Sequence, residues 1–254
     1  MSDKKALGYV EVALQDKVAI LTFYHPASNS FPNYLLQKLV EEINRLSVND
    51  AVNVVVLQSE TDVFCAGASF DELLSIQNKE DGALFFSGFA KVINAMRTCS
   101  KLIIGRVQGK AVGGGVGLIA ACDYVVAIEK SALKLSELSI GIGPFVIEPA
   151  ITRKIGISAF AEMSLSPMEW KTSQWAQEKG LFSKVVTNQD QLDHEIALKA
   201  SELAGYNPNA LLELKKIAWQ GTEKWDQLLL ERAAISGDLV LSDFTKQALE
   251  KYKK

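Results

Sequence analysis

Gly113-Gly-Gly-Val-Gly117 lies at the centre of this chain, inside the longer stretch Gly109-Lys-Ala-Val-Gly-Gly-Gly-Val-Gly-Leu-Ile-Ala-Ala-Cys-Asp123. An apolar, strand-like run precedes the glycines, and an apolar, helix-like run follows them. Consecutive glycines let the backbone turn tightly and approach a ligand closely, because no Cβ stands in the way. The helix that follows directs its unpaired N–H groups and the positive end of its dipole at the same point. The stretch therefore predicts a site for a group that is negative or becomes negative.

Strand-like and helix-like segments alternate on both sides of this stretch. Two β-rich runs within residues 8–24 predict a hairpin, and residues 35–46 have the apolar spacing of a helix. Continuous apolar runs at 53–59, 102–107 and 124–128 are typical of strands buried on both faces of a parallel sheet. Beyond residue 145 the pattern is almost wholly helical, with periodic runs at 192–204, 210–219 and 225–241. This order predicts an α/β core over residues 1–195 and a helical C-terminal region over residues 196–254.

Composition excludes several classes of function. The chain has 254 residues, is 48% hydrophobic and carries a net charge of -3, so it lacks the basic surface of a nucleic-acid binder. Its three cysteines, Cys65, Cys99 and Cys122, form no C-x-x-C pair, and neither a disulfide framework nor a metal site is expected. The N-terminus lacks the apolar core of a signal peptide, and no run reaches the length of a membrane span. We therefore expect a cytoplasmic protein with no membrane and no nucleic-acid partner.

Two other glycine-loop chemistries fit this sequence poorly. Gly105-Arg-Val-Gln-Gly-Lys-Ala111 has three residues between its glycines where a phosphate loop has four, and Ala111 replaces the Ser or Thr. Gly115-Val-Gly-Leu-Ile-Ala120 matches the loose dinucleotide pattern, but it lies in mid-chain rather than after the first strand. Neither a phosphate-loop protein nor a nicotinamide enzyme is therefore predicted.

A second loop, Phe64-Cys-Ala-Gly-Ala-Ser-Phe-Asp-Glu-Leu73, also follows a buried strand and precedes a helix. Together with Val112–Asp123 and Ser136-Glu-Leu-Ser-Ile-Gly141, it resembles the crotonase family, the enoyl-CoA hydratase and isomerase superfamily. The resemblance covers nearly the whole chain and implies a spiral of ββα units with a helical C-terminal subdomain. It also implies an acyl-CoA thioester substrate, no metal or cofactor beyond the CoA of that substrate, and a homotrimer or dimer of trimers joined by the C-terminal helices.

The resemblance further implies how the substrate is held. In that family two backbone N–H groups bind the thioester oxygen, and the motifs match them to Ala68 and Gly114. Such donors stabilise the negative oxygen of an enolate, which forms when a proton leaves the carbon beside a thioester. The substrate-binding positions implied by the same match are Ser28, Ala66, Gly67, Ser69, Phe70, Gly113, Gly115 and Pro144. The candidates for contact with a CoA phosphate are the tail lysines Lys246, Lys251, Lys253 and Lys254.

The number of carboxylates at the expected site favours isomerisation over hydration. Hydratases of the family carry two glutamates; here the first position is Gly117, whereas the second is retained as Glu137. A glutamate in an apolar segment has its pKa raised by desolvation toward the range of a general base. A 3-to-2 double-bond shift needs one base, whereas hydration must also position a water and move its protons. The expectation is thus a 3,2-enoyl-CoA isomerase with Glu137 as acid and base, and Ile140-Gly-Ile-Gly-Pro-Phe-Val146 also looks more like the monofunctional isomerases.

Two alternatives stay open from the sequence. The first is an enoyl-CoA hydratase whose water is held by Glu137, with or without help from Glu148. Glu148 is expected in a first helical turn, where the helix dipole favours a solvent-facing carboxylate. The second is a non-catalytic family member that only binds acyl-CoA.

Overall fold

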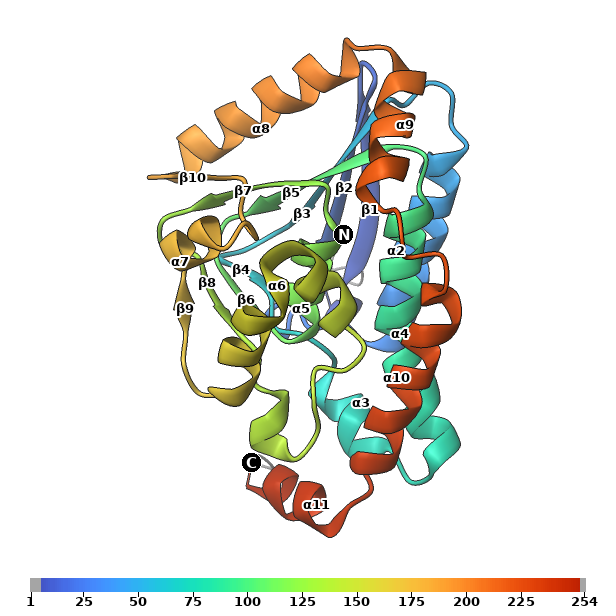
Figure 1. Cartoon of the computed structure of the whole chain (residues 1–254), viewed down its shortest axis with the longest axis vertical. Coiled ribbons are helices and arrows are strands. Elements are labelled where there is room, and N and C mark those ends of the chain that lie inside the picture. The colour runs from blue at the N-terminus through green and yellow to red at the C-terminus, as the bar shows by residue number, and fades with distance from the viewer. Residues whose placement is uncertain (1–5, 252–254) are drawn as a thin grey trace.

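The computed structural model describes residues 6–251 of the chain. These residues form two β-sheets that are enclosed by helices (Figure 1). The larger sheet has the order β1-β2-β3-β5-β7-β10, with bounds Tyr9–Gln15, Val18–Tyr24, Val54–Ser59, Leu102–Val107, Tyr124–Ile128 and Lys184–Val186. The smaller sheet has the order β4-β6-β8-β9, with bounds Val63–Cys65, Lys110–Val112, Ala132–Lys134 and Lys171–Thr172. All neighbouring strands are parallel except β1 with β2 and β8 with β9.

The chain winds through these sheets as a spiral. The pairs β3/β4, β5/β6 and β7/β8 each place one strand in the larger sheet and one in the smaller, and a helical segment follows each pair. These segments are α3 and α4 (Phe70–Ser75, Lys79–Thr98), α5 (Gly114–Ala121), and the 3₁₀ turn η1 with α6 (Glu137–Ile140, Glu148–Leu165). The predicted α/β spiral of ββα units is confirmed. Sequence reading missed the strands of the smaller sheet, because two or three residues are too few to show a period.

The core is built around α5. The helix is apolar on all sides, and every residue from Gly115 to Ala121 is buried, as expected for a helix at the centre of a domain. The hairpin β1–β2 and α2 (Asn33–Ser47) close one end of this core. On the opposite face of the larger sheet, α8 (Gln189–Ala204) covers a second apolar cluster that includes Val54, Ile104 and Val126. The sheet is therefore covered on both faces, as its continuous apolar strands predict.

The C-terminal part is helical, as predicted, apart from the short strands β9 and β10. Besides α8 it contains α7, α9, α10 and α11, with bounds Ser173–Glu178, Pro208–Ala218, Trp225–Leu239 and Asp243–Glu250. Figure 1 shows α10 lying along α4. The two backbones meet where a Cβ on Gly82 would lie 2.7 Å from the Cα of Gly237. The predicted boundary between residues 195 and 196 falls inside α8, and the division into domains stays a prediction.

Several large apolar side chains of the C-terminal helices remain exposed in the single chain. Leu214 and Ile217 on α9 are 61% and 67% exposed, and Leu230 on α10 is 46% exposed. The homotrimer or dimer of trimers stays a prediction, with these side chains as candidates for its contacts. No helix within residues 6–251 has both the length and the apolar character that crossing a membrane requires.

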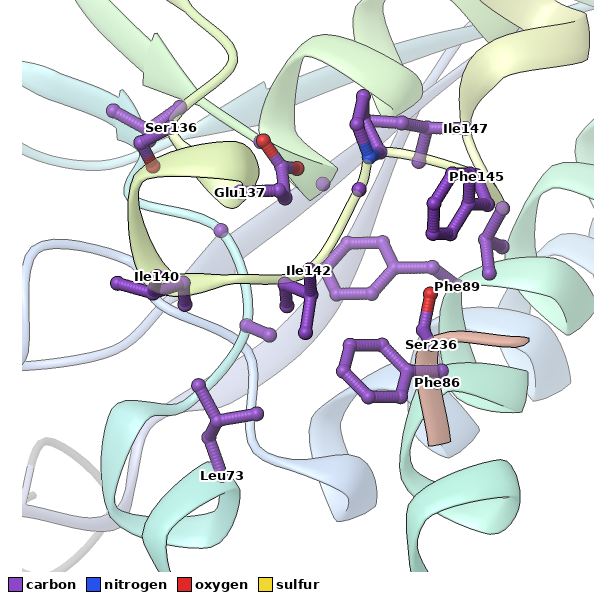
Figure 2. Close-up of a pocket in the computed structure, with 18 of the residues that line it drawn as sticks. Leu73, Phe86, Phe89, Ser136, Glu137, Ile140, Ile142, Phe145, Ile147 and Ser236 are labelled. Atoms are coloured by element: carbon purple, nitrogen blue, oxygen red, sulfur yellow. The ribbon is translucent and has the colours of Figure 1, made fainter. Parts of the chain in front are cut away.

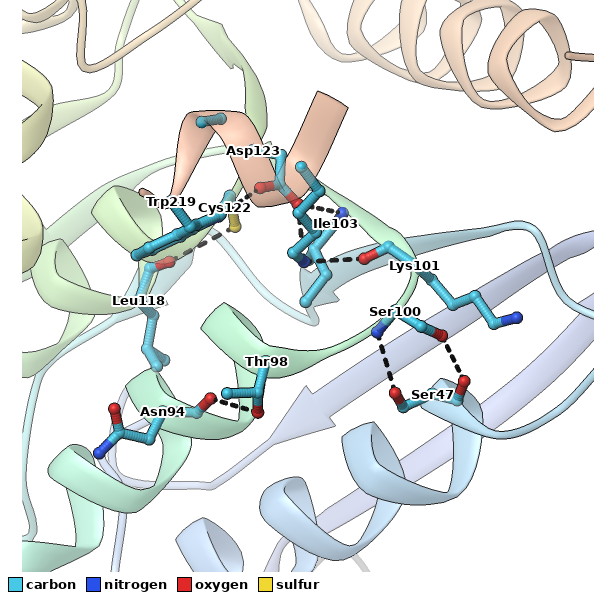
Figure 3. Close-up of polar contacts among 12 residues, drawn as sticks. Ser47, Asn94, Thr98, Ser100, Lys101, Ile103, Leu118, Cys122, Asp123 and Trp219 are labelled. Carbon is cyan, nitrogen blue, oxygen red and sulfur yellow. Dashed lines mark hydrogen bonds and ion pairs between the residues drawn. The ribbon is translucent and has the colours of Figure 1, made fainter. Parts of the chain in front are cut away.

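Asp123 ties the C-terminal helices to the core. Its carboxylate, directly after α5, accepts hydrogen bonds from the Ile103 backbone N–H and from the indole Nε1 of Trp219, both at 2.8 Å (Figure 3). The ammonium of Lys215 on α9 lies 3.0 Å from the same carboxylate, and its side chain is 3% exposed. A buried ammonium depends strongly on such a partner, because its water has been removed. Asp123 therefore holds a strand, a helix end and a buried cation together.

Asp123→Ala is expected to lower the free energy of unfolding by about 3 to 5 kcal/mol, because it leaves the buried Lys215 ammonium without a counter-charge. Asp62→Ala is the control, since the Asp62 side chain is 95% exposed and its one ion pair within residues 6–251 is with the exposed Lys130 at 3.5 Å. This control should change the free energy by less than about 0.5 kcal/mol. Urea unfolding followed by circular dichroism measures both, and equal effects of the two substitutions would contradict the role of Asp123.

Candidate active site

A cavity of about 160 Å³ opens where the two predicted loops meet (Figure 2). Its wall is formed by residues 66–68, parts of α3, the start of α5, the turn η1 with residues 142–147, and parts of α4 and α10. Of the site residues predicted from the sequence, those lining the cavity are Ala66, Gly67, Ala68, Phe70, Gly113, Gly114, Glu137 and Pro144. Three segments far apart in the sequence thus converge on one hollow.

Three predicted site residues lie close to the cavity without lining it. The backbone carbonyl of Ser28 accepts a hydrogen bond from the Ala66 N–H at 3.1 Å, which fixes the first loop from behind. Ser69 caps α3, where its Oγ accepts a hydrogen bond from the Glu72 N–H at 3.4 Å. Gly115 packs against β4, since a Cβ there would lie 2.7 Å from the Cys65 carbonyl oxygen. Their contacts with substrate stay predictions. Lys253 and Lys254 lie outside the described residues.

The two predicted N–H donors both lie in the cavity wall. Gly114 is the first residue of α5, so its N–H has no acceptor within the helix. The Ala68 N–H also makes no hydrogen bond to another residue of the described part of the chain. The loops touch, because a Cβ added to Gly67 would lie 3.7 Å from the Gly114 nitrogen. The arrangement offers two unpaired N–H groups to a ligand oxygen.

The backbone of Gly113 leaves the space that the Glu137 carboxylate occupies. Its φ of 52° and ψ of -118° belong to a region that residues with a side chain rarely adopt, and they let α5 begin abruptly after β6. A Cβ on Gly113 would lie 2.6 Å from Oε1 of Glu137. The carboxylate therefore rests directly on the glycine backbone, at the N-terminal end of α5. No other residue type leaves this space.

Glu137 is held in a poorly solvated position. It begins the turn η1, and Figure 2 shows its carboxylate at the edge of the cavity. Its Oε2 is buried and has no hydrogen-bond partner within residues 6–251. Burial raises the pKa of Glu137 from 4.5 to about 7, and a contact with its own backbone N–H only partly opposes the shift. A carboxyl group with such a pKa exchanges protons readily at neutral pH.

The space over Gly117 is filled by a hydrocarbon side chain. A Cβ on Gly117 would lie 2.4 Å from Cγ2 of Ile147, which stands at the start of α6. Glu148, the possible second carboxylate, is not among the described residues that line the cavity. It accepts a hydrogen bond from the Thr152 hydroxyl at 2.8 Å and lies 3.8 Å from the guanidinium of Arg232. The site thus has a single carboxylate beside the N–H donors.

An aromatic wall completes the cavity, and the sequence analysis did not assign it to the site. Phe85, Phe86 and Phe89 come from α4, and Phe145 comes from the segment before α6. Ser236 comes from α10, more than ninety positions further along the chain. The helical spacing of the α4 phenylalanines is equally typical of a helix face buried in the core. Only the fold therefore distinguishes a cavity wall from solid core. Within residues 6–251, no group of three or more His, Cys, Asp or Glu residues is arranged to hold a metal ion.

Comparison with known proteins agrees with this geometry. The family model described as enoyl-CoA hydratase/isomerase matches residues 13–251. The chain belongs to this family, the crotonase family. The 2,3-dehydroadipyl-CoA hydratase of Escherichia coli K12 is 32% identical over 214 residues, which are 84% of this chain and 82% of that protein.

Further relatives include both hydratases and isomerases. A peroxisomal Delta(3,5)-Delta(2,4)-dienoyl-CoA isomerase of Arabidopsis thaliana is 26% identical over 82% of this chain and 79% of its own. The crystal structure of an enoyl-CoA hydratase from Bacillus halodurans superposes with a TM-score of 0.88, covering 96% of this chain and 99% of that one at 22% identity. The last comparison establishes the shared crotonase fold. The protein is therefore an enzyme of the enoyl-CoA hydratase/isomerase family.

The pKa of Glu137 can be measured directly in the resting enzyme. With glutamate labelled at ¹³Cδ, one resonance should titrate near pH 7, far above those of exposed glutamates, because burial disfavours the charged form. Glu137→Gln should remove that resonance, which assigns it. If all glutamate resonances titrate below pH 5.5, the description of Glu137 as a desolvated carboxyl group is wrong.

Proposed function

We propose that this crotonase-family enzyme is a 3,2-enoyl-CoA isomerase with Glu137 as its acid and base. One observation carries the proposal: Glu137 is the sole titratable side chain among the described residues that line the cavity. Isomerisation moves a proton from one carbon to another, and a single carboxyl group can both accept and return it. Hydration must also activate and orient a water molecule, and this work would be divided between two carboxyl groups.

The reaction begins at C2 of a 3-enoyl thioester. The Glu137 carboxylate removes a proton from C2, and the electron pair of that C–H bond moves into a dienolate whose oxygen becomes negative. The N–H groups of Ala68 and Gly114 are the proposed donors to this oxygen, and one such donor is worth about 3 kcal/mol in an oxyanion hole. Electrons then return from the oxygen, C4 takes the proton from Glu137, and the double bond rests between C2 and C3. The carboxylate is regenerated, and the scheme uses only groups of the chain and of the substrate.

The environment of Glu137 supports its double role. A group with a pKa of about 7 is present in both protonation states at neutral pH, so it can accept a proton and then donate it. The hydrocarbon side chains around Glu137, including Ile142 and Ile147, keep water away. The proton therefore stays on the carboxyl group between the two steps and is not lost to water. They also offer few polar groups that could orient a nucleophilic water.

Hydration is the second candidate, because several relatives are named hydratases. Glu148 would have to leave Thr152 and Arg232 to serve as a second carboxylate. The substrate named for the Escherichia coli relative carries a carboxylate at the far end of its acyl chain. The described lining of this cavity contains no lysine, arginine or histidine to pair with such a group. We therefore do not extend that substrate to this enzyme.

Glu137→Gln should reduce turnover of 3-hexenoyl-CoA to 2-hexenoyl-CoA by at least about 1000-fold, because the amide cannot take the C2 proton. Product formation is followed by chromatography with both regioisomers and 3-hydroxyhexanoyl-CoA resolved. Glu148→Gln is the matched control and should retain turnover within a few-fold, since Glu148 lies outside the cavity lining. Hydroxyacyl-CoA as the main product of the wild type, or an active Glu137→Gln enzyme, would contradict the proposal.

The space over Gly117 offers a second prediction. Gly117→Glu alone should lower the melting temperature, because the new side chain collides with Ile147. Adding Ile147→Gly should relieve that collision, because both Cγ2 and Cβ of Ile147 lie within 3 Å of a Cβ on Gly117. The double variant would place a second carboxylate beside the cavity, so the ratio of hydration to isomerisation should rise at least several-fold over the wild type. Ile147→Gly without the glutamate is the control for the added space. An unchanged ratio in the folded double variant would show that the number of carboxylates does not determine the reaction.

A further inference from the structure

The hydroxyl group of Ser236 has no role in the chemistry described so far. Ser236 lies on α10, is 1% exposed and lines the cavity. Figure 2 shows Glu137 and Ser236 on opposite sides of the hollow, with the Phe89 ring between them and the Ser236 oxygen directed toward Phe89 and Phe145. The hydroxyl is therefore the polar group at the end of the cavity remote from the proposed base.

This hydroxyl makes no hydrogen bond to any described residue, and its oxygen keeps a small accessible surface at the cavity wall, unlike the fully buried Oε2 of Glu137. Serines inside helices commonly donate to the carbonyl three or four residues earlier, as Ser87 on α4 does to Leu84 at 2.7 Å and Ser164 on α6 does to Phe160 at 2.8 Å. A buried hydroxyl without a partner is unfavourable by roughly 1–3 kcal/mol. Its position at a cavity surface means that a bound molecule can supply the missing partner.

No helix contact explains the hydroxyl at this position. The backbones of α4 and α10 meet at Gly82 and Gly237, and Ser236, beside Gly237, lines the cavity instead. Ala233, one turn earlier on the same helix, is 1% exposed and carries no polar atom. An alanine at position 236 would therefore fit a buried helix position as Ala233 does and avoid an unpaired hydroxyl.

The surroundings of Ser236 restrict the group that it could bind. Phe86, Phe89 and Phe145 form the wall around it, and the described lining contains no cationic side chain. A carboxylate or phosphate would be placed in this apolar end without a counter-charge, which is strongly unfavourable. A neutral hydroxyl or keto oxygen needs only the one hydrogen bond that Ser236 can make.

We propose that Ser236 is a specificity-determining residue, and that the preferred acyl chain carries a neutral oxygen substituent, a hydroxyl or keto group, beyond its reacting carbons. The inference rests on the proposed function for the orientation of the substrate, with the thioester at the Glu137 end. Ser236 donates to or accepts from this substituent while the phenylalanines cover the hydrocarbon part of the chain. Substrate recognition thereby depends on α10, although the proposed chemistry lies on other elements.

Binding of unreactive ligands tests this inference without any turnover. Isothermal titration calorimetry compares hexanoyl-CoA with its 4-, 5- and 6-hydroxy and 5-keto derivatives, and with adipyl-CoA as the carboxylate-ended probe. One hydroxy or keto derivative should bind the wild type about tenfold more tightly than hexanoyl-CoA, the value of one well-formed hydrogen bond in an apolar site. Adipyl-CoA should bind more weakly than that derivative.

Ser236→Ala should abolish the preference and bring the two dissociation constants to within about twofold, whereas Ser236→Thr, which keeps a hydroxyl, should retain part of it. Ser87→Ala is the matched control, since Ser87 is a buried serine of the adjacent helix whose hydroxyl is already bonded. Ser87→Ala should leave the preference unchanged. If Ser236→Ala does not fold by circular dichroism, Ser236→Cys replaces the hydroxyl with a thiol, which is a much weaker hydrogen-bond partner of similar shape.

The outcomes separate this inference from the proposed reaction. A preference that depends on Ser236 supports the inference even if no 3-enoyl-CoA is isomerised, in which case the proposed function alone fails. Equal binding of all neutral derivatives, a preference that persists in Ser236→Ala, or tightest binding of adipyl-CoA would overturn it. Equal binding is also the result expected if the hydroxyl only holds a water molecule.

Discussion

The approach of the Glu137 carboxylate to the bare backbone of Gly113 is the contact on which the rest of the site depends. The two residues meet because α5 begins at a backbone conformation that is natural for glycine, and because a Cβ would stand 2.6 Å from the carboxylate oxygen. The same abrupt start places the Gly114 N–H in the cavity wall, next to the loop that carries Ala68. One backbone feature thus brings the proposed base and the two proposed N–H donors to a single hollow.

The neighbouring glycines serve different contacts. Gly114 leaves room for the edge of Phe89, Gly115 for the backbone of β4, and Gly117 for Ile147. These close approaches surround the N-terminal turn of α5 with protein on several sides, and they explain why that turn is buried. Burial in turn strengthens the interaction of an N–H group with a negative oxygen, because little water is present to compete. The glycine stretch therefore acts both as a packing element and as the rim of the site.

The same exclusion of water raises the pKa of Glu137 and leaves the hydroxyl of Ser236 unpaired. For the carboxyl group, desolvation yields a proton affinity that suits reversible transfer at neutral pH. For the serine, it creates a demand for a hydrogen bond that a polar atom of the ligand can meet. The reactivity proposed for one end of the cavity and the selectivity proposed for the other thus have one physical cause, the low polarity of the wall between them.

The amino-acid sequence by itself determined the spiral fold, the family and the candidate residues Ala68, Gly114 and Glu137. It could do so because apolar strands and glycine motifs have strong local signatures. It also determined that Gly117 carries no carboxylate. Only the tertiary structure decided that Ile147 fills the space over Gly117, that Glu148 is engaged with Thr152 and Arg232, and that phenylalanines of α4 face a cavity rather than solid core. The contribution of Ser236 likewise depends on α10 folding back along α4. These features arise from contacts between residues distant in the chain, and the periodicity of a segment records which of its faces is buried but not what lies against that face.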